Sequence, residues 1–368
     1  MTSVHVDTAR TWRGGQNQVL QLVTGLAERG DTPVLVAHAD GQLKRRAAEG
    51  LRFVGFTPRS EFDVHAAWQL ARVFKAVGPD VVHGHDPMGV SLSAMAVQMS
   101  GGLARRPLLV AARRVDFHLK RHAFSRWKYN RVDVFIAASR LIASMLEGDG
   151  IPASDIEVVH DGVNTSAIDR QPAVEAHGVF WLPKGAPLVG NIAALVPHKG
   201  QKHLVAAAAR VVPEVPDARF LILGEGELQD ALERQIRDLG LERHVLLGGF
   251  RADAIGLLKS FDLFAMSSVT EGLGSVILEA MACRRAVVAT RAGGIPEVVA
   301  DGETGVLVPP GDEAAMAAAI VALLGDAPRR AALGEAGRAR VERDFSVARM
   351  VDGTREVYRR RVAELGQS

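Results

Sequence analysis

Two glutamates, Glu271 and Glu279, lie in the stretch TEGLGSVILEAMAC, which follows the apolar run FDLFAMSS. The apolar run predicts a buried parallel strand, TEGLG a loop, and SVILEAMAC a helix. Gly274 or Ser275 would cap this helix, so that its first backbone N–H groups face an anion at the carboxyl edge of a sheet. Glu279 has apolar neighbours, and a carboxylate in such surroundings needs hydrogen-bond donors, which a sugar diol would supply.

Three further loops carry residue types that suit a ligand. In VPHKGQKHL, Lys199 and Gly200 stand where a helix begins, and an ammonium group beside a helix N-terminus suits a diphosphate. In RFLILGEGELQ, two glycines follow a strand as in a dinucleotide fingerprint, but the third glycine is replaced by Gln229, which disfavours a nicotinamide or flavin. This GEG pair, Gly224 and Gly226, forms either a plain turn or a close approach to some other ligand.

The loop TWRGGQNQ near the N-terminus contains Gly14 and Gly15. Glycines lack a Cβ, so this loop can bring its backbone close to a bound molecule. The pair is a weak signal on its own.

Length and composition set the broad class. The chain has 368 residues, 48% hydrophobic and 23% charged, with a net charge of +2. A chain of this length predicts two domains, each with a sizeable core. The single cysteine, Cys283, falls in an apolar helix, which excludes an internal disulfide and favours a reducing compartment. No apolar run reaches the ~18 residues of a membrane span, so the predicted location is the cytoplasm.

One segment, residues 105–131, is strongly basic and aromatic. It contains nine Lys or Arg residues and one acid, with interleaved Phe, Trp and Tyr. A solvated basic helix is one interpretation. The other is a surface that attracts an anionic membrane or a phosphorylated lipid acceptor, which would place the protein peripherally on the inner face of a membrane. Nucleic acid is not a predicted partner, because zinc-ligand spacing, single-strand-binding signatures and a chain-wide basic excess are missing.

Strands and helices alternate along the chain, which predicts parallel βαβ units in an α/β fold. The region TSAIDRQPAVEAHGVFWLPKGAP has no clear period and carries prolines, so it predicts a linker. We therefore expect two doubly wound, Rossmann-like domains that face each other across a cleft. The predicted divisions are an acceptor-side domain at 1–165, a linker at 166–186, a donor-binding domain at 187–345, and a C-terminal helix at 346–368 that packs back on the first domain.

Taken together, these motifs resemble the retaining family-four glycosyltransferases of GT-B fold (glycosyl transferases group 1). The resemblance rests on EGLGSVILE, the Lys-Gly pair, GEG, and ATRAGGIPEVVADGETGVLVPPGD from Ala289 to Asp312. It covers the second domain from about Leu188 onward, extends to the two N-terminal glycines, and is looser through the middle of the first domain.

The resemblance implies a role for each matched residue. Glu279 would accept the ribose hydroxyls, and Glu271 would face the donor sugar. Lys199 and the backbone N–H groups that follow Glu271 would stabilise charge on the leaving diphosphate, without a catalytic metal. The implied catalytic residues are Glu271 and Lys199. The implied donor-binding residues are Gly14, Gly15, Lys199, Gly224, Gly226, Phe250, Arg251, Glu271, Gly272, Leu273, Gly274, Ser275, Val276 and Glu279.

The sequence also departs from the family pattern. Ala194 stands where the family usually has a second, arginine clamp for the diphosphate, and Arg13, His198 or Lys202 are candidate substitutes. Arg114 stands at the family's usual histidine near the donor sugar, and Asp161 at a usual asparagine. The candidate acceptor-side residues are His85, Arg113, Arg114, His118, Lys120 and Arg121.

The resulting prediction is a retaining transferase that moves a sugar from a nucleotide diphosphate sugar to a glycan or lipid-linked, envelope-type acceptor. No cofactor is predicted beyond this co-substrate, and UDP-, GDP- and ADP-sugars stay open. Two alternatives are a catalytically silent sugar-nucleotide-binding module, motivated by Ala194, and a sugar-nucleotide epimerase on the same fold. The sequence carries no signature of oligomeric state.

Overall fold

The protein was analysed as a computed structural model, which describes residues 1–47, 50–101, 105–120 and 122–366. The chain forms two compact units. Unit 1 comprises Met1–Gly162 and Val347–Ser368, and unit 2 comprises Val163–Ser346. The chain therefore crosses from one unit to the other twice, after Gly162 and after Ser346.

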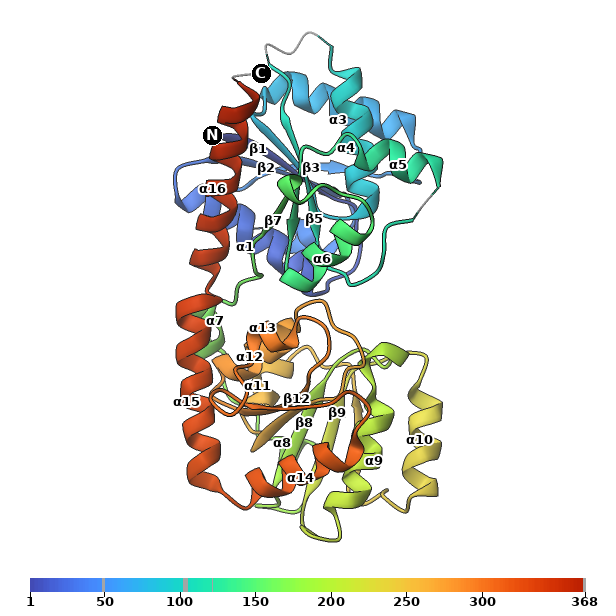
Figure 1. Ribbon diagram of the computed structural model, residues 1–368, viewed down its shortest axis with the longest axis vertical. Coiled ribbons are helices and arrows are strands. Elements are labelled where there is room, and N and C mark those ends of the chain that lie inside the picture. Colours follow the sequence, from blue (N-terminus) through green and yellow to red (C-terminus); the bar gives the residue numbers. More distant parts are fainter. Residues whose placement is uncertain (48–49, 102–104, 121, 367–368) are drawn as a thin grey trace. The chain divides into compact units, whose positions relative to one another are not determined.

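Unit 1 is built on a seven-stranded sheet in the order β3-β2-β1-β4-β5-β6-β7, in which every pair is parallel. The strands are β1 (Thr2–Asp7), β2 (Thr32–His38), β3 (Arg52–Phe56), β4 (Val81–Gly84), β5 (Leu108–Arg113), β6 (Val134–Ala137) and β7 (Ile156–Val158). The helices are α1 (Gly14–Glu28), α2 (Gln42–Arg46), α3 (Val64–Val77), α4 (Pro87–Met99), α5 (Ala123–Tyr129), α6 (Arg140–Gly148) and α16 (Val347–Leu365), with a short 3-10 turn at Ala153–Asp155 (Figure 1).

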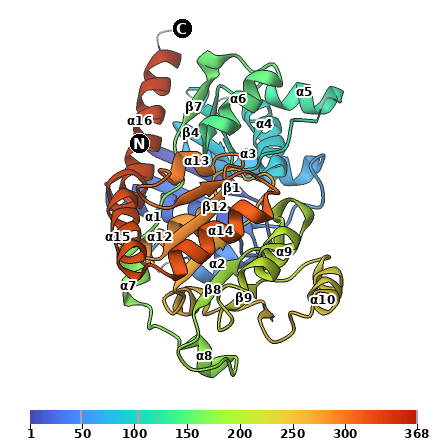
Figure 2. The ribbon, with the colours of Figure 1, turned by 60° about the horizontal axis from the view of Figure 1, so that its bottom comes forward.

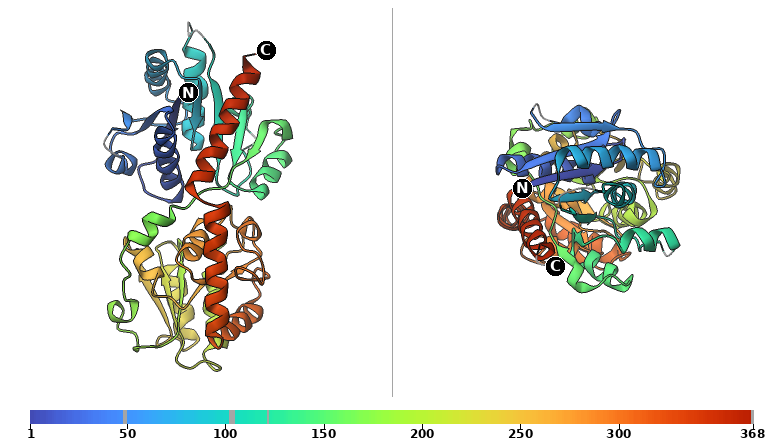
Figure 3. Two further views of the ribbon diagram at one scale, coloured as in Figure 1. Left: turned by 90° about the vertical axis from the view of Figure 1, so that its left-hand side faces the viewer. Right: turned by 90° about the horizontal axis from the view of Figure 1, so that it is seen from above.

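Alternation along the strands gives this sheet two different faces. Val4 and Val6 of β1 pack in the core formed with α3, α4 and α6. Ser3, His5 and Asp7 have the opposite parity and are also buried. That second face is covered by α1 and the C-terminal helix α16, which contact each other (Figure 3). The first unit thus buries one apolar face and one face with a polar stripe.

Unit 2 has a six-stranded parallel sheet in the order β10-β9-β8-β11-β12-β13. Its strands are β8 (Leu188–Ile192), β9 (Arg219–Leu223), β10 (Val245–Gly249), β11 (Leu263–Met266), β12 (Ala286–Thr290) and β13 (Val306–Val308). Its helices are α7 (Thr165–Arg170), α8 (Ala176–Val179), α9 (Gln201–Val211), α10 (Gln229–Asp238), α11 (Ala254–Leu258), α12 (Ser275–Ala282), α13 (Ile295–Val298), α14 (Glu313–Leu324) and α15 (Ala327–Asp344), with a 3-10 turn at Pro197–Lys199 (Figure 2).

Both faces of the second sheet are apolar. Helices α9 and α14 cover one face, and α11, α12, α13 and α15 cover the other. Residues 166–186, predicted as a linker, belong to unit 2, where Ile168 and Ala176 join its core. Residues 347–368 group with unit 1, where Met350, Val351 and Tyr358 of α16 pack in one apolar cluster with α1.

The strand orders locate the ligand-binding edge of each sheet. In unit 1 the order reverses between β1 and β4, and in unit 2 between β8 and β11. Ligands of open α/β sheets bind beyond the carboxyl ends of the strands at such a reversal. The loops at these points follow β1 and β4 in unit 1, and β8 and β11 in unit 2. The last two contain Lys199 and the TEGLG motif.

Candidate functional site

The loop between β11 and α12 ends in a glycine that the backbone requires. Gly274 is the N-cap of α12 and has a φ of 88°, in the left-handed region that a side chain disfavours. Ser275 is the first helical residue, so the cap is Gly274, and no side chain caps this helix. In the described part of the chain the backbone N–H groups of residues 272–276 make no hydrogen bond. A group of unsatisfied donors therefore stands at the carboxyl edge of the sheet, at a positive helix end.

Two glycines of the GGIPEVV motif fix the position of this loop. A Cβ on Gly293 would lie 1.9 Å from the Glu271 carbonyl oxygen, and a Cβ on Gly294 would lie 2.2 Å from the Gly272 carbonyl oxygen. The Gly294 N–H also donates to the Glu271 carbonyl at 2.9 Å. Any side chain at these two positions would push the TEGLG loop away. The co-occurrence of EGLG and GGIPEVV therefore has a steric cause.

The two predicted catalytic residues contact each other directly. Lys199 Nζ lies 2.5 Å from Glu271 Oε2, and both side chains are largely buried. Ser268 Oγ donates to the same carboxylate oxygen at 3.3 Å. Gly200, which has a φ of 64°, lets the loop after β8 pack closely on the loop after β11, because a Cβ at this position would lie 2.2 Å from the Ser267 carbonyl oxygen. This close packing holds the neighbouring Lys199 in place. The loops after β8 and β11 thus pack together and present an ion pair.

Glu279 lies one turn into α12, and its surroundings differ from those of Glu271. Burial raises the pKa of its carboxyl to about 7. Within the described residues this carboxyl has no hydrogen-bond or ion-pair partner. A partly buried acid without donors is costly, and a ligand that supplies two hydroxyl groups would remove that cost.

Other predicted donor-side residues lie around the same edge. The close approaches at Gly224 and Gly226 are to the backbone of the loop after β8, with Cβ distances of 1.9 Å to the Ala193 oxygen and 2.3 Å to the Leu195 oxygen. These glycines therefore position that loop, and their contact with a ligand stays a prediction. Phe250 is 69% exposed after the edge strand β10, a position open to a planar ring.

Arg251 and Ala194, two positions that the sequence placed near the donor, already have partners within the protein. Arg251 is paired with Asp253 at 2.7 Å, so its charge is already neutralised. The carbonyl of Ala194, in the predicted clamp position, accepts from the Gln201 amide at 2.9 Å. Lys202 is exposed on the first turn of α9.

On the first sheet the structure brings together only part of the predicted acceptor-side set. Arg114 donates through Nε to Asp161 at 2.9 Å, and its Nη1 lies 3.4 Å from His85 Nδ1. His118 instead pairs with Asp149 at 2.9 Å. Three further members of the set lie as follows: Arg113 donates to the Phe117 carbonyl, Lys120 is exposed, and Arg121 falls outside the described residues.

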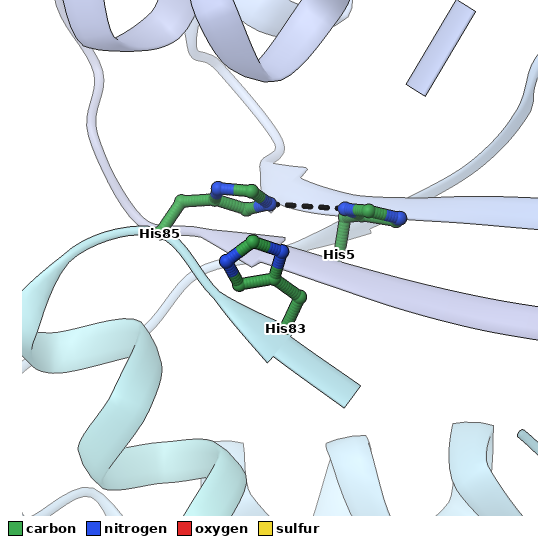
Figure 4. A group of neighbouring side chains, drawn as sticks. All are labelled: His5, His83 and His85. Atoms are coloured by element: carbon green, nitrogen blue, oxygen red, sulfur yellow. Dashed lines mark hydrogen bonds between the residues drawn. The ribbon is translucent and has the colours of Figure 1, made fainter. Parts of the chain in front are cut away.

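Beneath Arg114, three histidines from β1 and the end of β4 form a buried group (Figure 4). His85 Nε2 and His5 Nδ1 are 3.0 Å apart, and His5 Nε2 is 3.0 Å from Ser3 Oγ. Because an arginine can only donate, its contact with His85 Nδ1 places the proton of His85 on Nε2. His85 then donates to His5, and His5 donates to Ser3. This chain uses both nitrogens of two rings.

The third histidine of the group has a different partner. His83 Nδ1 bonds to the hydroxyl of Tyr358 on α16 at 2.5 Å, while its Nε2 has no partner in the described structure. Burial lowers the pKa of His5 to about 3 and holds the pKa values of His83 and His85 well below their ordinary range, and the charge of Arg114 adds to each effect. All three rings are therefore neutral at physiological pH.

Three imidazoles whose nitrogens lie within 4.8 Å of one another have the composition of a metal site. Two features oppose a metal ion here. The hydrogen-bond chain already uses the nitrogens of His5 and His85, and a guanidinium stands 3.4 Å from His85. The trio is better described as a hydrogen-bonded support beneath Arg114.

Two acids complete the edge of the first sheet. Asp86 accepts from the backbone N–H and hydroxyl of Thr8 and from the Gly89 N–H. Burial and the repulsion of Asp86 raise the pKa of Asp7 to about 6. The sequence reasoning missed Asp7, His5 and His83. The available signal was the spacing of two residues between His5 and Asp7 in VHVD and between His83 and His85 in HGHD, where β4 ends, since residues two apart in an extended chain lie on one face.

Comparison with known proteins shows the family. Residues 12–167 match the model described as Glycosyltransferase Family 4, and residues 175–340 match the model described as Glycosyl transferases group 1. EpsD of Bacillus subtilis (strain 168), a protein named as a glycosyltransferase, is 32% identical over 311 residues, which is 79% of each chain. The chain belongs to glycosyltransferase family 4. The resemblance predicted from the motifs is thereby confirmed.

Other relatives of this glycosyltransferase carry more specific names. A GDP-mannose-dependent alpha-(1-6)-phosphatidylinositol monomannoside mannosyltransferase of Mycolicibacterium smegmatis is 37% identical over 219 residues, 57% of each chain. Among solved structures, HepE of Anabaena in complex with UDP-glucose superposes with a TM-score of 0.82 at 23% identity, covering 97% of this chain and 99% of that one. A glycosyltransferase of Rickettsia africae ESF-5 gives a TM-score of 0.83 at 21% identity, covering 98% of both chains. These two structures support the two-domain fold.

Proposed function

We propose that this glycosyltransferase transfers a sugar from a nucleotide diphosphate sugar to a hydroxyl group of a glycan or lipid-linked acceptor, with retention of anomeric configuration. The observation that carries the proposal is the edge of unit 2. Three features lie there, after β8 and β11, where the strand order reverses. They are the Lys199–Glu271 ion pair, the unsatisfied N–H groups that begin α12, and the unpartnered Glu279. The ammonium group of Lys199 and the N-terminus of α12 suit the diphosphate, which is the leaving group, and the carboxylate of Glu279 suits the ribose hydroxyls.

The ion pair gives Lys199 and Glu271 complementary roles. A bound diphosphate competes with Glu271 for the ammonium group, because both are anions. As Lys199 turns to the phosphate, the carboxylate of Glu271 becomes available to accept from the hydroxyls of the donor sugar. Lys199 then stabilises the charge that grows on the diphosphate while the anomeric C–O bond breaks, a contribution larger in the transition state than in the ground state.

The bond changes of the transfer balance without a redox partner. The electron pair of the anomeric C–O bond goes to the departing diphosphate, and the acceptor oxygen bonds to the same face of the sugar. The acceptor's hydroxyl proton goes to an oxygen of the leaving phosphate. In this scheme the protein cation and the helix N-terminus take the role that a metal ion takes elsewhere.

Donor identity is proposed only by class. HepE is solved with UDP-glucose, and the mycobacterial relative is named for GDP-mannose. UDP-, GDP- and ADP-sugars therefore form the panel. The deciding experiment incubates the full chain with each donor and a set of glycan and lipid-linked acceptors, and measures nucleotide release and the anomeric configuration of the product by NMR. Product with inverted configuration, or release without product, would contradict the proposal.

Two alternatives make different predictions in the same assay. A catalytically silent module, favoured by Ala194 in the clamp position, binds donor without turnover for any acceptor. An epimerase changes the sugar of the donor with no acceptor present.

The acceptor side includes a surface suited to an anionic membrane. Phe62 is 55% exposed and its ring lies 4.3 Å from that of Phe124 on α5, which stacks on Trp127. Lys120 and Arg126 are exposed near this aromatic cluster in the sequence. No helix in the described residues is long and apolar enough to cross a bilayer. We propose peripheral binding by this surface.

The structure also selects the variants that test it. Lys128 is 3% exposed and bonds to Glu61 at 3.0 Å, so it does not belong to the membrane-facing charges. Changing Lys120 and Arg126 to Gln should weaken binding to vesicles of anionic lipid, with the loss growing smaller as salt is added. Changing Arg52 and Lys75 to Gln is the matched control. If vesicles fail to bind the parent chain at low salt, the membrane proposal falls.

A further inference from the structure

At the first crossing between the two units, three consecutive residues, Asp161, Gly162 and Val163, each make hydrogen bonds that hold the chain. Asp161 accepts from Arg114 at 2.9 Å. Gly162, the last residue of this part of unit 1, is bonded to Gln18. Val163 donates to the Phe345 carbonyl at 2.8 Å and forms a parallel bridge with Ser346, which is the last residue before the second crossing. The two crossings are therefore paired with each other directly after Gly162.

The bond between Gln18 and Gly162 is a two-point clamp. Gln18 Nε2 donates to the Gly162 carbonyl at 3.0 Å, and the Gly162 N–H donates to Gln18 Oε1 at 3.0 Å. Gln18 is 2% exposed, and the backbone of Gly162 is buried. Two opposed bonds fix direction as well as distance. Their loss leaves the buried N–H and carbonyl of Gly162 without partners, which is unfavourable.

The same turn of α1 carries the glycine loop. Gly14 begins the helix, and Gln18 lies four residues later on the same side. Between them Gln16 donates to Asp7 at the end of β1 at 3.2 Å and accepts from the Arg13 N–H at 3.2 Å. The first turn of α1 is thus bonded to β1 at one end and to the chain crossing at the other.

We infer that Gln18 is a positioning residue for glycosyl transfer, which holds the Gly14–Gly15 loop and the first chain crossing in one fixed arrangement. The inference rests on the proposed function. With Gly162 clamped to α1, unit 1 is held up to its last residue before the first crossing, and Val163, the next residue, is paired with the second crossing. Closure of a two-domain enzyme needs such a fixed end, so that rotation occurs at a defined place.

The test replaces Gln18 with Met, which keeps the length of the side chain and removes both bonds. Gln21→Met is the matched control, because Gln21 lies on the same helix and its Oε1 is buried without a partner. We expect Gln18→Met to lower kcat about tenfold and to speed hydrogen exchange at residues 161–163. Nucleotide Kd should change much less than kcat, because Lys199, the N-terminus of α12 and Glu279 lie in unit 2 and only the Gly14–Gly15 loop of the predicted donor-binding set lies in unit 1. Gln21→Met should change none of the three.

Three outcomes would overturn the inference. The first is an unchanged kcat in Gln18→Met. The second is an equal loss in kcat, nucleotide affinity and thermal stability, which indicates general destabilisation. The third needs no variant: in the parent chain the Gly162 N–H exchanges as fast as an exposed amide. If the parent transfers no sugar, the proposed function fails on its own, and the exchange measurement still decides whether the clamp exists.

Discussion

The two sheets present their carboxyl edges to ligands in opposite ways. At the edge of unit 2 the polar groups are open: the N–H groups before α12 make no hydrogen bond within the described chain, and Glu279 has no partner there. At the edge of unit 1 the polar groups described above bond to one another, apart from His83 Nε2: Asp161 holds Arg114, and Asp86 holds Thr8. Open donors and acceptors bind a charged ligand, whereas satisfied ones orient each other. This contrast supports the proposal that the nucleotide binds at unit 2 and that the network of unit 1 has a supporting role.

The largest effect that separates the two edges should come from Lys199→Ala. In the proposed mechanism, removing the cation deletes stabilisation of the leaving diphosphate, which for a single well-placed group is worth about 10²–10³-fold in kcat. Donor KM should change much less, because the charge on the phosphate grows only as the bond breaks. Steady-state kinetics measure this, with replacement of the exposed Lys75 of α3 by Ala as control. An effect confined to KM would argue against a transition-state role.

A smaller loss is expected from Gly294→Ala, which tests whether the open edge depends on glycine packing. Its φ of −81° suits alanine, so the cost comes from the Cβ placed 2.2 Å from the Gly272 carbonyl. We expect a loss of about 1–3 kcal/mol in the free energy of unfolding, measured with urea, together with weaker nucleotide binding. Gly148→Ala, where nothing lies within 4 Å of the new Cβ, is the control. Equal stability of the two variants would refute the packing account.

On unit 1 the effect should appear in stability. Tyr358→Phe removes the hydroxyl that bonds to His83 and leaves both nitrogens of that buried ring without partners. We expect a loss of about 1–3 kcal/mol in the free energy of unfolding, with nucleotide affinity unchanged. Tyr129→Phe controls for the loss of a hydroxyl, since the Tyr129 hydroxyl makes no hydrogen bond in the described part of the chain. A fall in nucleotide affinity in Tyr358→Phe would contradict the division of roles.

The same contrast explains what the sequence predicts and what it does not. Strand, glycine loop, helix start and both glutamates of unit 2 lie within residues 263–282, so local pattern predicts their arrangement. The polar network of unit 1 joins β1, the loops after β4 and β5, residue 161 and α16. Its contacts depend on the sheet order and on α16, whose Tyr358 lies 275 residues after His83 in the chain. Local spacing does not encode such contacts.

Individual residues show the same limit. Lys128 reads as one of nine basic residues in a surface segment, yet Glu61 and Ser91 draw its ammonium group into the interior. Gly224 and Gly226 read as a ligand-binding loop, yet their missing side chains make room for the neighbouring loop. In both cases the partner comes from a distant segment, so the residue type alone does not indicate direction.

The acid at Glu279 gives the second unit a pH dependence. Its pKa of about 7 lies above the ordinary 4.5, so between these values the folded chain holds a proton that the unfolded chain has lost. This contribution to stability is therefore present below pH 4.5 and is lost as the pH rises through 7. A ligand whose hydroxyls donate to the carboxylate favours the ionised form, so binding releases the proton.

Proton release on nucleotide binding tests the central claim most directly. UDP, GDP and ADP are titrated calorimetrically into the parent, Glu279→Gln and, as control, the exposed Glu335→Gln, in buffers of different ionisation enthalpy at pH 6.5 and pH 8. We expect the parent and the control to release a large fraction of a proton at pH 6.5 and little at pH 8. Glu279→Gln should release none and bind about 10 to 100 times more weakly, from the loss of charge-assisted bonds at ~1.5–3 kcal/mol each. Unchanged affinity and unchanged proton release in Glu279→Gln would contradict the assignment of the nucleotide to this edge.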